Sequence, residues 1–389
     1  MKRFLRRPVV LSTALALLVG GSTAGYLYAR AEPGGVEASF TLAAGGDVLI
    51  HPEITEQAVK DAREAGRPGP DFGAVMAGIK PVVAKADLAV CHMETAMAEP
   101  KGPFLGYRKF SVPPQIAGTL KDLGYDACST ASNHTLDHGP EGVRRTLDTL
   151  DAAGLRHTGS ARDAREAATP LVLDVKGVKV AQLSYAYGLN DTTVPKDKPW
   201  LVNVTDVRRM AEDEKRARAA GAEVVFASVH WGREGRAEAS RAQTRLAERI
   251  AEETGIDLVV GHHAHVVQPF EKVGSTWFAY GLGNQVARHA QPLGVTEEGV
   301  LGWFSFTKRK GSWSVSDARF VPTLVELEPR IRLVDVGAAL KGGGLTAQQR
   351  SRYRTAFERT RGTVLNRGAE KDGLRPLTIT EWPRQKGQS

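Results

Sequence analysis

Cysteine is scarce in this chain, whose 389 residues include only Cys91 and Cys128. Two cysteines allow at most one disulfide, so the fold cannot depend on a network of cross-links. Both residues follow apolar runs near the expected ends of strands, and such a pair can oxidise outside the cytoplasm. Sequence alone does not give the separation of the two side chains. We therefore slightly favour two small buried apolar side chains, which free cysteine resembles, and leave a disulfide open.

The body of the chain also lacks an excess of positive charge. The net charge is +8, but residues 1–30 carry five Lys and Arg and no acid, and residues 330–389 carry thirteen against five acids. Residues 31–329 hold 34 basic and 39 acidic side chains. This balance argues against a nucleic-acid-binding face, and we expect no nucleic acid partner. The basic C-terminal end could meet an anionic polymer or lipid head groups, or could be a solvated tail.

One long run has no charged residue: the 21 residues 8–28, which follow Lys2, Arg3, Arg6 and Arg7. About 20 apolar residues span a bilayer as a helix, whereas the apolar part of a cleaved signal usually has ~7–15. We predict that residues 1–31 are a basic cytoplasmic end and a single-pass anchor in the cell membrane, with the body extracytoplasmic. Ala29-Arg30-Ala31 could also be a cleavage site, so a secreted form remains the alternative.

The chain has no evident internal repeat and no low-complexity tract. After a linker at residues 32–38, strand-like and helix-like segments alternate, which favours an α/β domain with a largely parallel core sheet. The expected strands are 39–44, 86–91, 125–130, 171–175, 178–185, 222–229 and 256–260, and the expected helices are 54–64, 72–85, 114–123, 140–153, 205–220 and 240–254. Antiparallel hairpins are predicted from 266–270, 276–280, 301–307 and 313–320. The main domain is placed at 39–328, followed by a basic C-terminal extension, 329–389, with a helix near 346–360.

Polar side chains recur where the apolar runs stop. A polar residue at that point lies at the carboxyl end of a strand, outside which α/β sheets bind their ligands. Carboxylate, amide oxygen and imidazole together suit zinc or another divalent transition metal. The residues in question are Asp47, His92, Glu94, Asn133, His134, His230, His262, His263, His265 and Asn284.

In this order the loops resemble the CapA family of capsule synthesis proteins, which is linked to poly-γ-glutamate biosynthesis and is similar to calcineurin-like metallophosphoesterases. The resemblance runs from about residue 40 to about residue 284 and implies a four-layered α/β/β/α sandwich. The matching stretches are Gly46-Asp47-Val48, the Glu94 loop, Asn133-His134-Thr135-Leu136-Asp137-His138-Gly139, His230-Trp231-Gly232-Arg233-Glu234, Gly261-His262-His263-Ala264-His265 and Tyr280-Gly281-Leu282-Gly283-Asn284.

The chain departs from the phosphoesterase pattern at two points. Those enzymes usually open with Asp-x-His, whereas Leu49 stands two residues after Asp47 and the nearest histidine is His51. Their second motif usually supplies an Asp, where this chain has Glu94 preceded by His92.

The resemblance implies a role for each of the main residues. His134 would protonate the leaving oxygen as a general acid, and Glu94 would bridge two ions about 3.5–4 Å apart. Asp47 could instead be a turn residue. Asp137 could equally orient His134 or cap the next helix. The predicted metal ligands are Asp47, Glu94, Asn133, His230, His263 and His265.

Other residues are predicted to support the site or contact the substrate. In an extended segment, residues two apart share a face, which favours His263 and His265 over His262, although a bent loop would keep His262 a candidate. Glu234 would orient His230. His157 and His289 are expected to lie apart from the metal. The supporting or substrate-contacting set is His51, His92, Asp137, Glu234, His262, Asn284 and Arg108.

The sequence thus predicts a membrane-anchored, extracytoplasmic CapA-like protein that takes part in the biosynthesis, export or trimming of an anionic capsule polymer such as poly-γ-glutamate. Its pocket would hold a divalent metal, with two ions of manganese, zinc or iron expected. Two alternatives stay open. One is a non-catalytic polymer-binding subunit of a synthase complex, and the other is a secreted metal-dependent phosphoesterase or nucleotidase.

Overall fold

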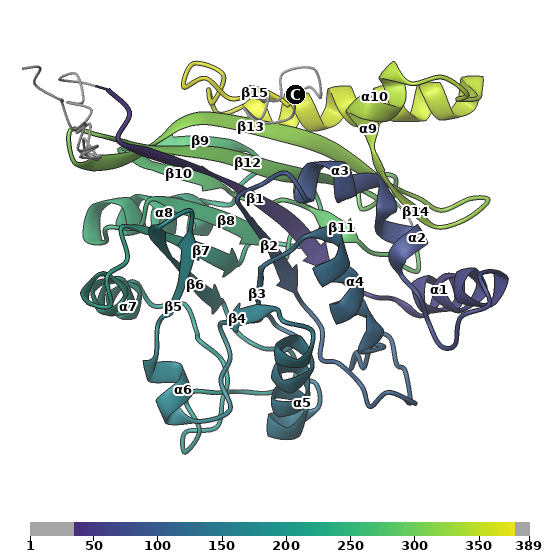
Figure 1. Ribbon diagram of the computed structural model, residues 1–389, viewed down its shortest axis with the longest axis horizontal. Coiled ribbons are helices and arrows are strands. Elements are labelled where there is room, and N and C mark those ends of the chain that lie inside the picture. The colour runs from purple at the N-terminus through teal and green to yellow at the C-terminus, as the bar shows by residue number, and fades with distance from the viewer. Residues whose placement is uncertain (1–34, 292, 378–389) are drawn as a thin grey trace, which may run out of the picture.

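Two β-sheets pack face to face in the computed structural model, which describes residues 35–291 and 293–377 (Figure 1). The first sheet has the order β14-β13-β12-β1-β2-β3-β4, with β11 beside β1 and β15 beside β13. Its strands are β1 (Ala38–Val48), β2 (Leu88–Met93), β3 (Ala127–Ser129), β4 (Arg156–Thr158), β11 (Asn284–Val286), β12 (Glu298–Arg309), β13 (Ser312–Glu326), β14 (Arg332–Asp335) and β15 (Arg375–Pro376).

The second sheet has the order β5-β6-β7-β8-β10-β9. Its strands are β5 (Leu171–Val175), β6 (Val178–Ala186), β7 (Val224–His230), β8 (Leu258–His262), β9 (Phe270–Val273) and β10 (Thr276–Ala279). In each sheet the central strands run parallel: β1 to β4 in the first, and β6, β7, β8 and β10 in the second. Their carboxyl ends therefore meet at one edge of the sandwich.

The space between the sheets is filled by apolar side chains, because alternate residues of each strand face the opposite sheet. We call this cluster the inter-sheet core. It contains Phe40 and Leu42 of β1, Phe304 of β12, Phe226 of β7 and Leu258 of β8, all at most 1% exposed. Burial of such side chains typically stabilises a fold by about 1.5–3 kcal/mol each.

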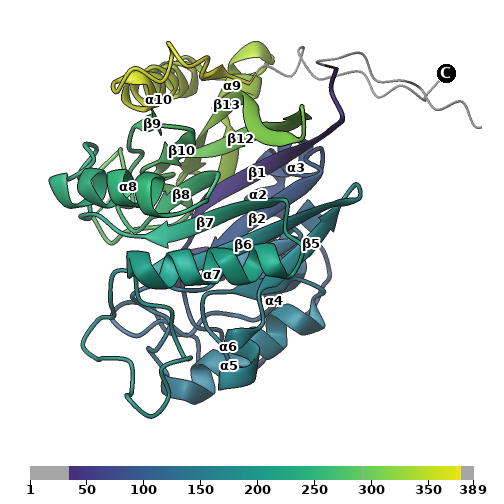
Figure 2. The ribbon, with the colours of Figure 1, turned by 90° about the vertical axis from the view of Figure 1, so that its left-hand side faces the viewer.

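Helices cover the outer face of each sheet, which gives four layers (Figure 2). The helices α7 (Val207–Ala219) and α8 (Arg241–Glu253) pack on the second sheet, and the short helix α6 (Ala164–Ala168) precedes β5. A capping box formed by Ser240 and Gln243 begins α8. The first sheet is covered by α1 (Pro52–Glu64), α2 (Gly73–Met76), α3 (Lys80–Val83), α4 (Gln115–Leu123) and α5 (Gly139–Ala152).

The C-terminal part of the described chain packs on the first sheet. The strand β14 pairs with β13 and leads into α9 (Val336–Lys341) and α10 (Ala347–Leu365), which lies across the top of the molecule in Figure 1. Tyr353 and Ala356 of α10 pack on Leu324 and Val336, while Val364 reaches the inter-sheet core.

Most expected elements agree with the structure, and the differences have local causes. The helix expected at 72–85 is three short turns, α2, a 3₁₀ turn at Ala77–Ile79 and α3. Gly78 lies so close to β14 that a Cβ atom would meet the Leu333 carbonyl oxygen at 2.2 Å. The strand expected at 266–270 is wrong, since β9 begins only at Phe270. The short strands β4, β11 and β14 were not expected.

The predicted anchor and cleavage site lie outside the described residues. Within residues 35–291 and 293–377, no helix is both long enough and apolar enough to cross a bilayer.

Candidate metal centre

The polar residues singled out in the sequence converge where the parallel strands end. Asp47 lies near the end of β1, His92 near the end of β2, His230 at the end of β7 and His262 at the end of β8. All four are at most 2% exposed. Because these strands run parallel, their last residues gather at one edge of the two sheets. We call this group, together with Glu94, Asn133, His263 and His265, the histidine cluster.

A pair of glycines within β1, Gly45 and Gly46, lets β11 lie beside Asp47. A Cβ atom on Gly46 would lie 2.1 Å from the Gly283 carbonyl oxygen, so only glycine allows this approach. The Asp47 amide donates to the Gly283 oxygen at 2.9 Å, and Asp47 is in register with Asn284. The Gly45-Gly46 pair thus places two polar side chains next to each other.

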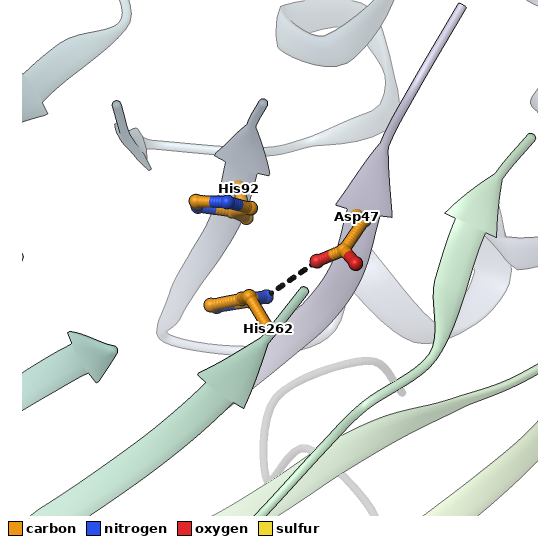
Figure 3. Close-up of side chains that lie close together, drawn as sticks. All are labelled: Asp47, His92 and His262. Carbon is orange, nitrogen blue, oxygen red and sulfur yellow. Dashed lines mark hydrogen bonds and ion pairs between the residues drawn. The ribbon is translucent and has the colours of Figure 1, made fainter. Parts of the chain in front are cut away.

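Asp47 is held by three groups at the end of β8 and in the loop that follows it. One carboxylate oxygen is 3.0 Å from Nδ1 of His262, as Figure 3 shows. The other accepts from the His263 backbone amide at 3.1 Å and lies 3.2 Å from Nδ1 of His265. Asp47 therefore links the first sheet to the second at the centre of the cluster, and it is not a simple turn residue.

Two histidines stack beside Asp47, and a third contacts this pair through a ring nitrogen. The rings of His92 and His262 lie 4.0 Å apart between centroids and are nearly parallel (Figure 3). Nε2 of His92 is 3.0 Å from Nδ1 of His230, and Nε2 of His230 is 2.8 Å from the amide oxygen of Asn133. Nδ1 of His92 is 2.8 Å from the hydroxyl of Ser129.

Glu94 has no hydrogen-bond partner among the described residues for either carboxylate oxygen, although its side chain is fully buried. One oxygen lies 3.7 Å from Nε2 of His265 and 4.0 Å from Nε2 of His230. Buried carboxylates are normally hydrogen-bonded, so these two oxygens are open to a further ligand such as a metal ion.

The loop after β8 is bent, and this bend decides which histidines reach the cluster. His263 and His265 both have positive φ angles, 86° and 54°. The segment is therefore not extended, and this is the condition under which His262 stays a candidate ligand beside His263 and His265. All three rings take part, and the buried Nδ1 of His263 has no hydrogen-bond partner among the described residues.

His134 stands next to the cluster in a separate polar pair. Its Nδ1 is 2.8 Å from Asp137, which also accepts the Phe110 backbone amide at 2.8 Å. Helix α5 starts after His138 with no side-chain cap, so Asp137 contacts the imidazole and not the helix end. Nε2 of His134 is 3.3 Å from the side-chain nitrogen of Asn190.

Burial and neighbouring charges set the protonation of the cluster. Burial raises the pKa of the Glu94 carboxyl to about 7, although the positive charge of His265 acts in the opposite direction and lowers it. Burial opposes the charged form of His265, but Glu94 and Asp47 outweigh it and raise its pKa to about 10. Burial lowers the pKa of His92 and His230 well below the usual range, and that of His263 to about 4. These three imidazoles are neutral at pH 7, which is the form that binds metals.

The pKa values of Asp47 and His134 are also shifted. Burial raises the pKa of Asp47, but the hydrogen bonds from His262 and His265 dominate and bring it well below the usual range. Burial lowers the pKa of His134, but the hydrogen bond to Asp137 and the charge of Glu94 dominate and raise it. A raised pKa keeps more of the His134 ring protonated near neutral pH, as a proton donor requires.

The donor set fits a divalent metal. Three groups bring ligand atoms within 4.8 Å of one another: Asp47 with His92 and His262, Asp47 with Glu94 and His265, and Glu234 with His263 and His265. The oxygens of Glu94 and the Nδ1 of His263, which have no hydrogen-bond partner among the described residues, are free to bind a cation. Imidazole and carboxylate donors suit zinc, manganese or iron.

The remaining predicted residues lie at different distances from this centre. Glu234 groups with His263 and His265, and no hydrogen bond to His230 is found among the described residues. Asn284 accepts from Nδ1 of His265 at 3.0 Å. His51 accepts the Arg288 amide through Nδ1 and lies 5.2 Å from the His289 ring, beside the cluster. Arg108 is fully exposed in the loop that precedes Phe110.

Sequence reasoning missed several neighbours of the site. His289, expected to be unrelated, lies 5.2 Å from the His265 ring and contacts Asn284 at 3.2 Å. Tyr187 is 48% exposed and lies over His263 at 4.7 Å between ring centroids. Asn190 follows in the same loop. No motif marks these residues, although Tyr187 stands two residues after the end of the predicted strand at 178–185, and this position could have indicated it. His157 does lie elsewhere, on β4 beside Asp151.

The preference for two free cysteines is also wrong. Cys91 and Cys128 are register partners on neighbouring strands β2 and β3 and form a disulfide, with 4.4 Å between their Cα atoms. Each cysteine directly precedes a residue of the site region, His92 and Ser129. Sequence could not show that two residues 37 positions apart lie side by side.

The chain matches a known protein family. Residues 41–289 match the family described as bacterial capsule synthesis protein PGA_cap. The chain belongs to this family. The match covers the strands and loops that carry the whole histidine cluster.

Curated relatives agree with this assignment. The chain is 26% identical over 179 residues to the capsule biosynthesis protein CapA of Bacillus anthracis, which covers 45% of this chain and 43% of the relative. It is 28% identical over 172 residues to the PGA biosynthesis protein CapA of Bacillus subtilis, with 43% and 44% covered. The matched part thus spans less than half the length of either relative.

Among solved structures, the chain is similar to the calcineurin-like phosphoesterase YfkN from Bacillus subtilis. The TM-score is 0.46 at 17% identity, with 84% of this chain and 98% of that chain covered.

Proposed function

We propose that this protein acts in the biosynthesis, export or trimming of an anionic capsule polymer such as poly-γ-glutamate, through a divalent-metal centre in the histidine cluster. Membership of the capsule synthesis family supports the biological role. The observation that carries the metal centre is Glu94, a fully buried carboxylate whose two oxygens have no hydrogen-bond partner among the described residues.

Two ions fit the donor set best. Two of the three ligand groups share Asp47, so Asp47 is the carboxylate best placed to contact both ions. His92 and His262 would complete one group, and Glu94 and His265 the other. We expected Glu94 to be the shared ligand, and the clustering favours Asp47 in its place. Asn133, His230 and His263 supply the remaining donors.

The cluster would support hydrolysis of a phosphoester or of an amide such as a γ-glutamyl bond. A pair of divalent ions would polarise the scissile group and lower the pKa of a water molecule. The residues of the chain do the rest. His134 holds a proton on its ring and is oriented by Asp137 at 2.8 Å, so it is placed to donate that proton to a leaving oxygen or nitrogen. Tyr187 covers the exposed side of His263.

The protein would act outside the cytoplasm, held by the charge-free segment at residues 8–28. The disulfide supports this location, because structural disulfides persist in oxidising compartments. Fractionation of cells tests the anchor. A protein recovered only in soluble fractions, starting near residue 32, would show a cleaved signal.

The catalytic role is tested by comparing His134→Ala, Asn133→Ala and a control, His157→Ala, on a panel of phosphoesters and γ-glutamyl peptides. His134→Ala should retain metal and lose about 10²–10⁴-fold in turnover, because a general acid typically contributes that much. Asn133→Ala should lose metal and activity together. His157→Ala should retain both, since His157 lies on β4 beside Asp151.

A non-catalytic subunit predicts a different result. In that case wild type would hydrolyse none of the panel, and His134→Ala would restore capsule formation fully in a deletion strain.

A further inference from the structure

A groove of about 300 Å³ lies between α9 and α10 and extends to Asp335 of β14 and Pro376 of β15. The two helices lie at the top of the molecule in Figure 1. Its lining includes Leu340, Lys341, Arg350, Arg354 and Phe357. A second hollow of about 430 Å³ adjoins it along α10, and both share Arg350, Arg354 and Glu358. We call the two hollows together the α9–α10 groove.

The arginines of α10 divide into two sets. Arg352 and Arg359 both form ion pairs with Glu298, at the start of β12, and so attach the helix to the first sheet. Arg350 and Arg354 lie one helical turn apart on the ridge between the hollows, about 6 Å along the axis. Arg354 is exposed, and Arg350 donates to the Leu340 carbonyl oxygen at 3.4 Å.

The cations of the groove have no salt-bridge partner within the described part of the chain, and the one acid whose charge interacts with them is the buried Asp335, which acts on Lys341. Lys341, Arg350 and Arg354 form no salt bridge with any described residue. The one exposed acid of the groove, Glu358, lies 3.7 Å from Arg361. Uncompensated cations beside a hollow are typical of a site for an anionic partner.

The floor of the groove is apolar. Leu340, Phe357 and Leu377 are only partly buried there. The groove therefore combines two surfaces, an apolar floor and a cationic ridge.

We propose that the α9–α10 groove binds a segment of a γ-linked polyglutamate chain, at a site separate from the metal centre. This inference rests on the proposed role in capsule polymer biosynthesis. Each γ-linked unit carries one free carboxylate and a stretch of two methylene groups. The carboxylates would pair with Arg350, Arg354 and Lys341, and the methylene groups would cover Phe357 and Leu340.

Charge argues against the chain's own C-terminal end as the occupant. Residues 378–389 follow directly on Leu377 at the groove, but they carry two basic residues and one acid. A segment of net positive charge does not complement a cationic ridge, whereas a polycarboxylate does.

The helix α10, which lines the groove, also contacts the loop before β12, and this loop contacts a residue of the metal centre. Arg352 donates to the Gly294 carbonyl oxygen at 2.6 Å, and Asn284, which contacts His265, donates to the Thr296 carbonyl oxygen at 2.8 Å. A polymer held on α10 would thus lie on a helix attached to the loop that supports the site.

The test measures binding of fluorescently labelled γ-linked polyglutamate to the full-length protein by anisotropy, at low and at physiological salt. Arg350→Gln/Arg354→Gln should weaken binding about five- to twentyfold, since an exposed ion pair is worth up to about fivefold. The matched control, Arg245→Gln/Lys371→Gln, removes the same charge at two exposed positions outside the groove and should change binding less than about twofold. Binding should weaken as salt is raised.

Metal content and the hydrolysis panel are measured on the same variants, so that a failure of the groove can be told from a failure of the metal centre. Groove variants should retain wild-type metal and turnover on small substrates. Equal binding by wild type and the double variant overturns the proposal, as does the absence of binding by wild type. Two other outcomes also overturn it: binding only to anionic phospholipid vesicles, which would indicate a lipid site, and binding only after deletion of residues 378–389, which would show that the tail fills the groove.

Discussion

The inter-sheet core and the histidine cluster are built on the same strands and have opposite chemistry. Along β1, Phe40 and Leu42 lie in the apolar core, and Asp47 follows at the carboxyl end. Along β8, Leu258 lies in the core and His262 ends the strand. Each strand is apolar along the inter-sheet core and carries a buried polar side chain at its carboxyl end.

This difference separates stability from function. The inter-sheet core stabilises the fold, and the histidine cluster carries the function. Apolar burial contributes about 25 cal/mol per Å². A buried polar group without a hydrogen bond costs about 1–3 kcal/mol. Glu94 and His263 bear this cost, and a sequence that concentrates such side chains at strand ends indicates a functional site.

The largest expected effect comes from breaking the core. Phe304→Ala should lower the free energy of unfolding by about 3–5 kcal/mol, because it leaves a cavity between the sheets. Metal content per folded molecule should be unchanged. Urea denaturation checks this, with Leu105→Ala, at a site 45% exposed, as the control that should change stability little. A small effect for Phe304→Ala would mean that the sheets are held together elsewhere.

The disulfide lies between the inter-sheet core and the histidine cluster. Removing it tests whether it affects the stability of the fold or the binding of metal. Cys91→Ala/Cys128→Ala should cost about 2–4 kcal/mol of stability, because the bond closes a loop of 37 residues. Affinity for metal should change little, since neither sulfur is a candidate ligand. A parallel measurement of denaturation and metal content checks both parts. Loss of metal with unchanged stability would show that the disulfide serves to position His92.

The third prediction concerns pH. In the metal-free protein the pKa of Glu94 is raised to about 7 and that of His265 to about 10. Both groups must lose a proton to bind an ion, so metal affinity should fall as pH falls. Below pH 7 both bind protons, and the affinity should drop at least about tenfold per pH unit. Titration calorimetry at pH 6, 7 and 8 measures this, with circular dichroism to show that the fold is retained. A flat profile would exclude Glu94 and His265 as ligands.

Much of both regions could be predicted from the sequence. The strands of the core have clear apolar runs, and the residues that follow them mark the cluster. The bend at His263 and His265 could not be predicted, because positive φ angles there arise from the contacts of the loop with Asp47. The sequence also could not show which residues that are far apart in the chain lie close together in the fold. The Cys91–Cys128 pair and the position of His289 depend on strand order, which local patterns do not encode.

Direct metal analysis of the purified full-length protein tests the central claim most sharply. After incubation with manganese, zinc or iron and removal of excess, wild type should hold up to two divalent ions per chain and unfold at a higher temperature than the stripped protein. Glu94→Gln and Asp47→Asn should each lose metal and this thermal shift, while His157→Gln should retain both. Wild-type protein that binds none of the three metals, with no change in its unfolding temperature, would contradict the account.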